Sequence, residues 1–142
     1  MKVLFQRCHE SAVIPSYANP GDAGMDISSA ERVVIPAGER RLVRTGLKMQ
    51  LPPGTEAQVR PRSGLAVRDG VTLLNTPGTI DEGYRGELCV VMINHGTEEF
   101  QVEPGMRIAQ MVIAPVLRAE ISEVNELNAS IRGEGGFGST GV

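Results

Sequence analysis

Leu88-Cys-Val-Val-Met-Ile93 is an unbroken apolar run, and Ile108-Ala-Gln-Met-Val-Ile113 repeats the pattern with one polar interruption at Gln110. Runs this short, bounded by turn residues, predict buried strands. A strand that is apolar on both faces must be covered on both faces. Because a chain of 142 residues has limited material for two covering layers, we expect one face of the sheet to meet another subunit.

Turn signals rich in proline and glycine separate further short β-rich segments. This pattern is typical of an all-β sandwich or jelly roll, here a single domain. The expected additional strands are Arg32 to Ile35, Arg41 to Leu51, Ala57 to Arg60 and Val71 to Leu74. One short helix is expected over Ser63 to Arg68, with Ser63 as its N-cap.

Composition restricts the classes of partner. The net charge of −3 argues against nonspecific nucleic-acid binding. No apolar run approaches the ~20 residues of a membrane span, and residues 1–7 lack the features of a signal peptide. Cys8 and Cys89 show no metal-site spacing and no disulfide framework. We therefore expect a cytoplasmic protein with no nucleic-acid or membrane partner, in which both cysteines are small buried hydrophobes.

The C-terminal segment Arg132-Gly-Glu-Gly-Gly-Phe-Gly-Ser-Thr-Gly-Val142 has the composition of a lid. Five of its eleven residues are glycine, which disfavours a resting helix or strand. Its arginine, aromatic ring and Ser-Thr pair suit phosphate and a flat base. The match to G-x-G-x-x-G is rejected, because only four residues follow Gly138, too few for the helix that motif requires. We expect a body over residues 1–130 and a flexible lid over 131–142.

Gly21-Asp-Ala-Gly-Met-Asp26-Ile is a glycine-rich turn that leads into an expected strand with Asp26 at its start. An aspartate at this position is most often structural. It could also hold a hard cation such as Mg²⁺ through water.

Pro61-Arg-Ser-Gly-Leu-Ala66 places Arg62 beside the expected start of the helix. The free N–H groups of a helix start favour anions. With an arginine beside them, the segment becomes a candidate phosphate site.

Asn75-Thr-Pro-Gly-Thr-Ile-Asp-Glu-Gly-Tyr-Arg-Gly86 reads as a hairpin-like stretch between two strands. Turn chemistry explains Asn75 and Gly78 but explains Asp81 and Tyr84 less well. An aspartate near its reference pKa is ionised at neutral pH and could take a proton from water.

Arg107-Ile-Ala-Gln110 places two polar residues at the start of an apolar strand. Gln110 is either a core glutamine with internal partners or a rim residue that offers its amide to a ligand. The pattern leaves both interpretations open.

Taken in chain order, with the C-terminal segment last, the five segments resemble the five motifs of the trimeric dUTPase family (deoxyuridine 5'-triphosphate nucleotidohydrolases). No motif position departs from the family pattern. The resemblance implies a distorted jelly-roll β-sandwich assembled as a homotrimer, with active sites shared between subunits. It implies a dUTP diphosphatase that cleaves dUTP to dUMP and pyrophosphate with Mg²⁺, which keeps uracil out of DNA and supplies dUMP for thymidylate synthesis.

The resemblance also implies roles for the residues of the third motif. Asp81 would be the catalytic base that activates water for attack on the α-phosphate. The side chain of Asn75 and the backbone near Gly78 would bind uracil. Tyr84 would pack on the deoxyribose and exclude a 2′-hydroxyl.

By the same resemblance, the remaining site residues would bind phosphates, base or metal. The phosphate-binding residues of the body would be Arg62, Ser63, Gly64 and Gln110. In the lid, Phe137 would stack on uracil, and the phosphates would be closed by Arg132, Gly138, Ser139 and Thr140. Asp26 would support the water shell of the metal. Arg107 is either structural or on the phosphate side.

Two alternatives remain at the level of sequence. One is a dCTP deaminase on the same fold. The other is a noncatalytic relative that binds a nucleotide for regulation.

Overall fold

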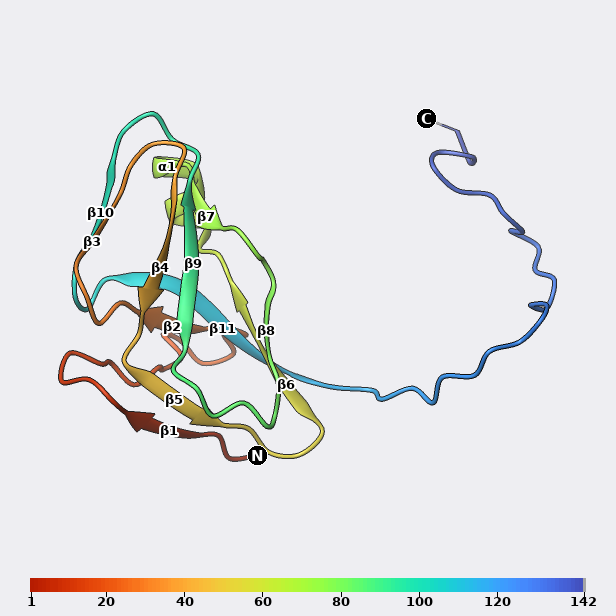
Figure 1. Ribbon diagram of the computed structural model, residues 1–142, viewed down its shortest axis with the longest axis horizontal. Coiled ribbons are helices and arrows are strands. Elements are labelled where there is room, and N and C mark those ends of the chain that lie inside the picture. The colour runs from red at the N-terminus through yellow and green to blue at the C-terminus, as the bar shows by residue number, and fades with distance from the viewer. Residues whose placement is uncertain (142) are drawn as a thin grey trace.

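The computed structural model describes residues 1–141, and Val142, the last residue of the expected lid, lies outside them. The chain forms a compact β body from which the C-terminal segment extends away (Figure 1). The strands of the first half are β1 (Leu4–Arg7), β2 (Met25–Ser28), β3 (Val33–Ile35), β4 (Arg40–Arg44), β5 (Leu47–Gln50) and β6 (Thr55–Arg60). The helix α1 (Ser63–Asp69) and the strands β7 (Val71–Leu73), β8 (Gly78–Ile80), β9 (Cys89–Asn94), β10 (Phe100–Val102) and β11 (Arg107–Pro115) follow.

The strands form one four-stranded sheet in the order β2-β11-β6-β8, one three-stranded sheet in the order β4-β9-β7, and the two-stranded pairs β1-β5 and β3-β10. All pairings are antiparallel. In the larger sheet, Gln110 of the central strand β11 lies opposite Asp26 of β2 and Arg60 of β6. The expected all-β class is confirmed, and this register places residues of the first and fourth motifs side by side.

The apolar run of β9 has one face in the core and one face that this chain covers only in part. Val90, Met92 and Asn94 are buried, whereas the alternate residues Cys89 and Val91 are half-buried. Beside them on β4, Leu42 is 59% exposed. Within the chain this apolar sheet face is left partly open, and the contact with another subunit that the sequence predicted for it stays a prediction.

The strand expected over Arg41 to Leu51 is interrupted between β4 and β5. Gly46 has φ +68°, a conformation that glycine adopts at little cost. The buried Thr45 hydroxyl donates a 2.6 Å hydrogen bond to the carbonyl of Leu88, which fixes the bend against the strand β9.

One local prediction was wrong. The N-cap of α1 is Arg62, without a side-chain capping bond, and Ser63 is the first helical residue. The stretch from Asn75 to Gly86 does connect two antiparallel partners, because the flanking strands β7 and β9 pair with each other, and within it β8 pairs with β6 of the other sheet. This long connection therefore leaves the three-stranded sheet, adds β8 to the four-stranded sheet and returns to β9, so its polar residues lie between the two sheets.

The C-terminal segment leaves the body directly after β11. The last backbone hydrogen bond into the body joins the amide of Val116 to the carbonyl of Gly54 at 2.9 Å. Beyond it, the chain is mostly exposed, and Arg118 forms an ion pair of 3.8 Å with Glu82 of the body. The backbone hydrogen bonds in this part are local turns, such as the bond from the Ser139 amide to the Gly136 carbonyl. Of the helices in residues 1–141, none is long and apolar enough to cross a membrane.

The two cysteines differ from the prediction of buried hydrophobes. Cys8 is exposed and Cys89 is half-buried. Within the described residues both thiols are free. Cys8 follows the edge strand β1, where the chain turns outward, whereas Cys89 begins β9 on its partly open face.

Candidate functional site

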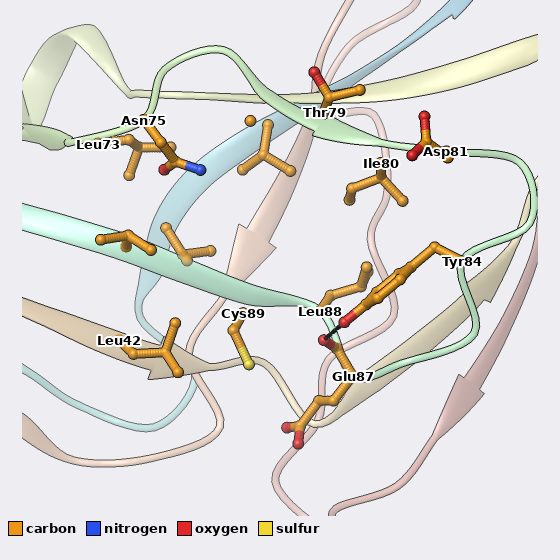
Figure 2. A pocket seen from close by; sticks show the side chains of 14 residues that line it. Leu42, Leu73, Asn75, Thr79, Ile80, Asp81, Tyr84, Glu87, Leu88 and Cys89 are labelled. Carbon is orange, nitrogen blue, oxygen red and sulfur yellow. Dashed lines mark hydrogen bonds between the residues drawn. The ribbon is translucent and has the colours of Figure 1, made fainter.

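Residues of the third motif line one cavity of about 380 Å³ between the two larger sheets. Asn75, Gly78, Asp81 and Tyr84 line it, and Figure 2 shows the side chains of Asn75, Asp81 and Tyr84 around it. Its floor is apolar and includes Leu88 and the neighbouring strand β9. A concave apolar site with a few polar groups at its rim suits a flat, partly polar ligand.

Asp81 and Tyr84 are held together by a single turn. The amide of Tyr84 donates to the carbonyl of Asp81 at 3.1 Å. Asp81 follows β8 directly and is exposed. Among residues 1–141, its carboxylate has no ion pair or hydrogen-bond partner, so both of its oxygens are free to accept a proton or a water.

Tyr84 reaches back across the cavity rim. Its hydroxyl donates a 2.9 Å hydrogen bond to the carbonyl of Glu87, as the dashed line in Figure 2 shows. The phenol is therefore directed by the backbone, and 45% of the residue remains exposed to a ligand.

The titration behaviour of two cavity residues is shifted by their surroundings. The hydrogen bond from Arg44 holds the pKa of the Glu87 carboxyl below its usual value, and it raises the pKa of the Arg44 guanidinium. Burial raises the pKa of the Cys89 thiol. Cys89 therefore stays protonated at neutral pH and is a poor nucleophile there.

The residues expected to bind phosphate line a second cavity, of about 340 Å³. Arg62, Ser63 and Gly64 enter it from the start of α1, and Gln110 enters from β11. Its lining is more polar than that of the first cavity. A guanidinium, a hydroxyl and an amide around one hollow are groups that bind phosphate oxygens.

Gln110 is positioned by two neighbours. Its amide nitrogen donates to the carbonyl of Pro61 at 2.9 Å. Its amide oxygen lies against Gly24, where an added Cβ would be only 2.5 Å away. The side chain thus has an internal partner and also lines the cavity, so both interpretations left open by the sequence describe part of its role.

Asp26 lies between two arginines. Its carboxylate oxygens are 3.2 Å from Nε of Arg62 and 3.0 Å from Nη1 of Arg107. Arg107, whose role the sequence left undecided, therefore contacts the first motif. No group of three or more His, Cys, Asp or Glu side chains within residues 1–141 could hold a metal.

The predicted site residues thus fall into three separate places. Asn75, Gly78, Asp81 and Tyr84 share one cavity. The four phosphate residues and Asp26 share another cavity, and the two cavities have no lining residue in common. The lid residues line neither cavity. Phe137 is fully exposed, and the C-terminal segment to which it belongs extends away from the body (Figure 1).

Sequence reasoning missed several residues at these cavities. Leu42 and Val91 line the first one, and Asp22 and Ala18 line the second. The Arg44–Glu87 pair beside Tyr84 was also missed. Its partners are 43 positions apart, and only the pairing of β4 with β9 brings them together.

Comparison with known proteins shows consistent likeness over nearly the whole chain. The sequence matches the family described as dUTPase over residues 10–141. It is 59% identical over 142 residues to the deoxyuridine 5'-triphosphate nucleotidohydrolase of Crocosphaera subtropica, with 100% of both chains covered.

Solved structures resemble this fold closely. The dUTPase of Staphylococcus bacteriophage 80alpha with dUPNHPP superposes with a TM-score of 0.92 at 29% identity, covering 99% of each chain. A variant of the dUTPase from phage phi11 of S. aureus, described as coordinating a structural Mg(II) ion, gives a TM-score of 0.84 at 24% identity. That alignment covers 91% of this chain and 100% of the phage chain.

Proposed function

This chain belongs to the dUTPase family, and we propose that its two cavities act as the base-and-sugar half and the phosphate half of a site that hydrolyses dUTP to dUMP and pyrophosphate. The family assignment confirms the dUTP diphosphatase activity and the dUTPase-like jelly roll expected from the sequence. The observation that carries the residue assignments is the unpaired carboxylate of Asp81 beside Asn75 and Tyr84.

In the reaction, Asp81 accepts a proton from a water molecule as the water oxygen attacks the α-phosphorus. The bond from that phosphorus to the bridging oxygen of the β-phosphate breaks, and pyrophosphate leaves. A positioned base of this kind contributes typically about 10²–10⁴-fold in rate. Asn75 and the backbone at Gly78 bind the uracil edge, and the ring of Tyr84 packs on the deoxyribose.

The second cavity supports the charge of the triphosphate. Arg62 and Gln110 hold phosphate oxygens, and Ser63 and Gly64 contact the bridge where negative charge develops. Asp26 restrains Arg62 from the other side, because its carboxylate lies 3.2 Å from Nε of that arginine. The arginine is thus oriented before substrate binds.

The residues of this chain fit a Mg²⁺ ion that is held mainly by the substrate. Both oxygens of Asp26 face guanidinium groups, and no three acidic side chains converge in residues 1–141. Mg²⁺ keeps several waters and commonly binds through one carboxylate together with substrate phosphates. When bound, it neutralises phosphate charge, and Asp26 is the residue that would contact its water shell.

The site is completed between subunits of a homotrimer. The two cavities are separate within one chain, while a substrate must contact both at once. The partly open apolar face beside Leu42 and Val91 offers a surface for a neighbouring subunit. Juxtaposing the base cavity of one subunit and the phosphate cavity of the next brings the catalytic carboxylate, the base and sugar contacts and the phosphate contacts of the body into one site.

The C-terminal segment over residues 131–142 is the lid of this site. Phe137 is fully exposed and Arg132 bonds only to the carbonyl of Gly135, so neither is committed to the body of its own chain. On closure, Phe137 stacks on uracil, and Arg132, Ser139 and Thr140 cover the phosphates, with Gly138 allowing close approach. Such a closure excludes water that does not take part in the reaction.

The test is pyrophosphate release from dUTP, dCTP, dTTP and UTP in the presence of Mg²⁺. We expect turnover of dUTP alone at an appreciable rate. Ammonia release from dCTP would favour a deaminase, and nucleotide binding without turnover would favour a regulator. We place the activity in the cytoplasm, in agreement with the two free thiols found among the described residues.

A further inference from the structure

The ring of Tyr84 rests directly on the backbone of its own loop. A Cβ built on Gly86 would overlap the phenol oxygen and lie 2.6 Å from Cζ of the ring. Only glycine fits at this position while Tyr84 keeps its orientation. The phenol hydrogen bond to the carbonyl of Glu87 then fixes the far end of the ring.

Glu87 is in turn anchored by its side chain. Its carboxylate accepts hydrogen bonds from Nε of Arg44 at 3.0 Å, from Nη2 of Arg44 at 2.8 Å, and from the amide of Gly46 at 3.0 Å. The Glu87 side chain is 18% exposed, against 53% for Arg44. Both guanidinium nitrogens bond Oε2 of Glu87, and Nε also lies 3.3 Å from Oε1. A pair with several bonds and one largely shielded partner is more rigid than an ordinary surface ion pair.

The anchor lies between a fixed and an exposed part of the loop. Leu88, the next residue, is buried and its amide donates to the carbonyl of Leu47 at 2.7 Å. On the other side, Arg85 is exposed and contacts only nearby carbonyls of its own loop. The carboxylate of Glu87 is therefore the last tertiary anchor before Tyr84.

We propose that the Arg44–Glu87 pair is a positioning element for Tyr84 that sets how strictly the site rejects a ribonucleotide. The inference rests on the proposed function, in which Tyr84 packs on the deoxyribose. The Tyr84 ring can exclude a 2′-hydroxyl only if it is held firmly in place against the sugar. Loosening the pair lets the phenol retreat, which admits UTP while dUTP still finds its base and phosphate contacts.

The test compares kcat/KM for dUTP and UTP in the full-length wild-type protein and in Glu87→Gln, Arg44→Gln and the double variant. Rejection of an added hydroxyl by shape alone amounts to about 100-fold. We expect the UTP-to-dUTP ratio of kcat/KM to rise about tenfold in each single variant, because loosening the ring should remove part, but not all, of this rejection. The double variant should rise no further, because each single change already breaks the same pair.

Glu103→Gln is the matched control, since it removes one carboxylate from the remote Arg32–Glu103 pair, whose N–O distance is also 2.8 Å. Its ratio should equal that of the wild type. If the UTP-to-dUTP ratio of kcat/KM is unchanged in the Arg44 and Glu87 variants, whatever their melting temperature, the inference is overturned. The proposed dUTP hydrolysis would not be affected by that result. If Glu87→Gln does not fold, Arg44→Lys replaces it, because lysine keeps the charge and loses the two-pronged contact. A wild-type protein without dUTP turnover would overturn the proposed function itself, and this inference with it.

Discussion

Replacing Asp81 with asparagine separates chemistry from structure at this site. Within residues 1–141 the Asp81 carboxylate makes no ion pair or hydrogen bond, so the nearly isosteric amide removes no contact there. Stability should change by no more than about 0.5 kcal/mol. Loss of a positioned base should lower kcat by about 10²–10⁴-fold, which corresponds to about 3–5 kcal/mol in the activation barrier.

The assay pairs pyrophosphate release under saturating dUTP with equilibrium binding of a non-hydrolysable dUTP analogue. We expect affinity within about threefold of the wild type, because an uncharged partner removes repulsion with phosphate and leaves the base contacts in place. Glu82→Gln is the comparison in the same turn. The Glu82 carboxylate accepts a hydrogen bond from the amide of Gly54, so this variant should lose some stability and keep turnover. Near-normal kcat in Asp81→Asn would refute the assignment of Asp81 as the base.

Three further outcomes follow from particular contacts. Gly24→Ala would place a Cβ 2.5 Å from Oε1 of Gln110 and disrupt the hydrogen bond from Gln110 to the carbonyl of Pro61, a loss of about 1 kcal/mol. This variant should bind dUTP about fivefold more weakly than the wild type. Gly83→Ala is the control and should bind dUTP normally, because no atom lies within 4 Å of the added Cβ. Truncation after Ser130 should leave a trimer by sedimentation with poor turnover, and dissociation into monomers would show that the segment holds the assembly together. The Arg44 hydrogen bond lowers the pKa of Glu87 below its usual 4.5, so the stability that the bond adds is present above the unfolded pKa and is lost as pH falls through the folded pKa. The difference in melting temperature between the wild type and Glu87→Gln should therefore shrink below about pH 4.5. A difference that stays constant down to about pH 3 would count against the Arg44–Glu87 pair as its source.

The fold class and the membership of the site could be predicted because they depend on local patterns. Short apolar runs between turn residues predicted the strands β9 and β11, and the structure groups the site residues of the body that the motifs indicated around two cavities. The open face of β9 followed from an apolar run that a small chain cannot cover twice. These inferences require residue type and spacing but no knowledge of which strands pair.

The features that could not be predicted depend on pairing between distant segments. The flanks of residues 75–86 pair with each other as expected, but the pairing of β8 with β6 of the other sheet was not predicted, because turn residues alone do not say which strand a short segment joins. The anchoring of Tyr84 through Arg44 and Glu87 requires β4 to lie beside β9. The contact of Arg107 with Asp26 likewise arises from the pairing of β11 with β2.

A mixed-subunit experiment tests the central claim, that one subunit supplies the base cavity and another the phosphate cavity. Asp81→Asn and Arg62→Ala chains, each inactive alone, are unfolded together in equal amounts, refolded, and assayed for pyrophosphate release from dUTP. If the two residues of one site come from different subunits, random assembly should restore about one quarter of wild-type activity. Because a site built within one chain always carries one of the two defects, a mixture that stays as inactive as its components would contradict the account.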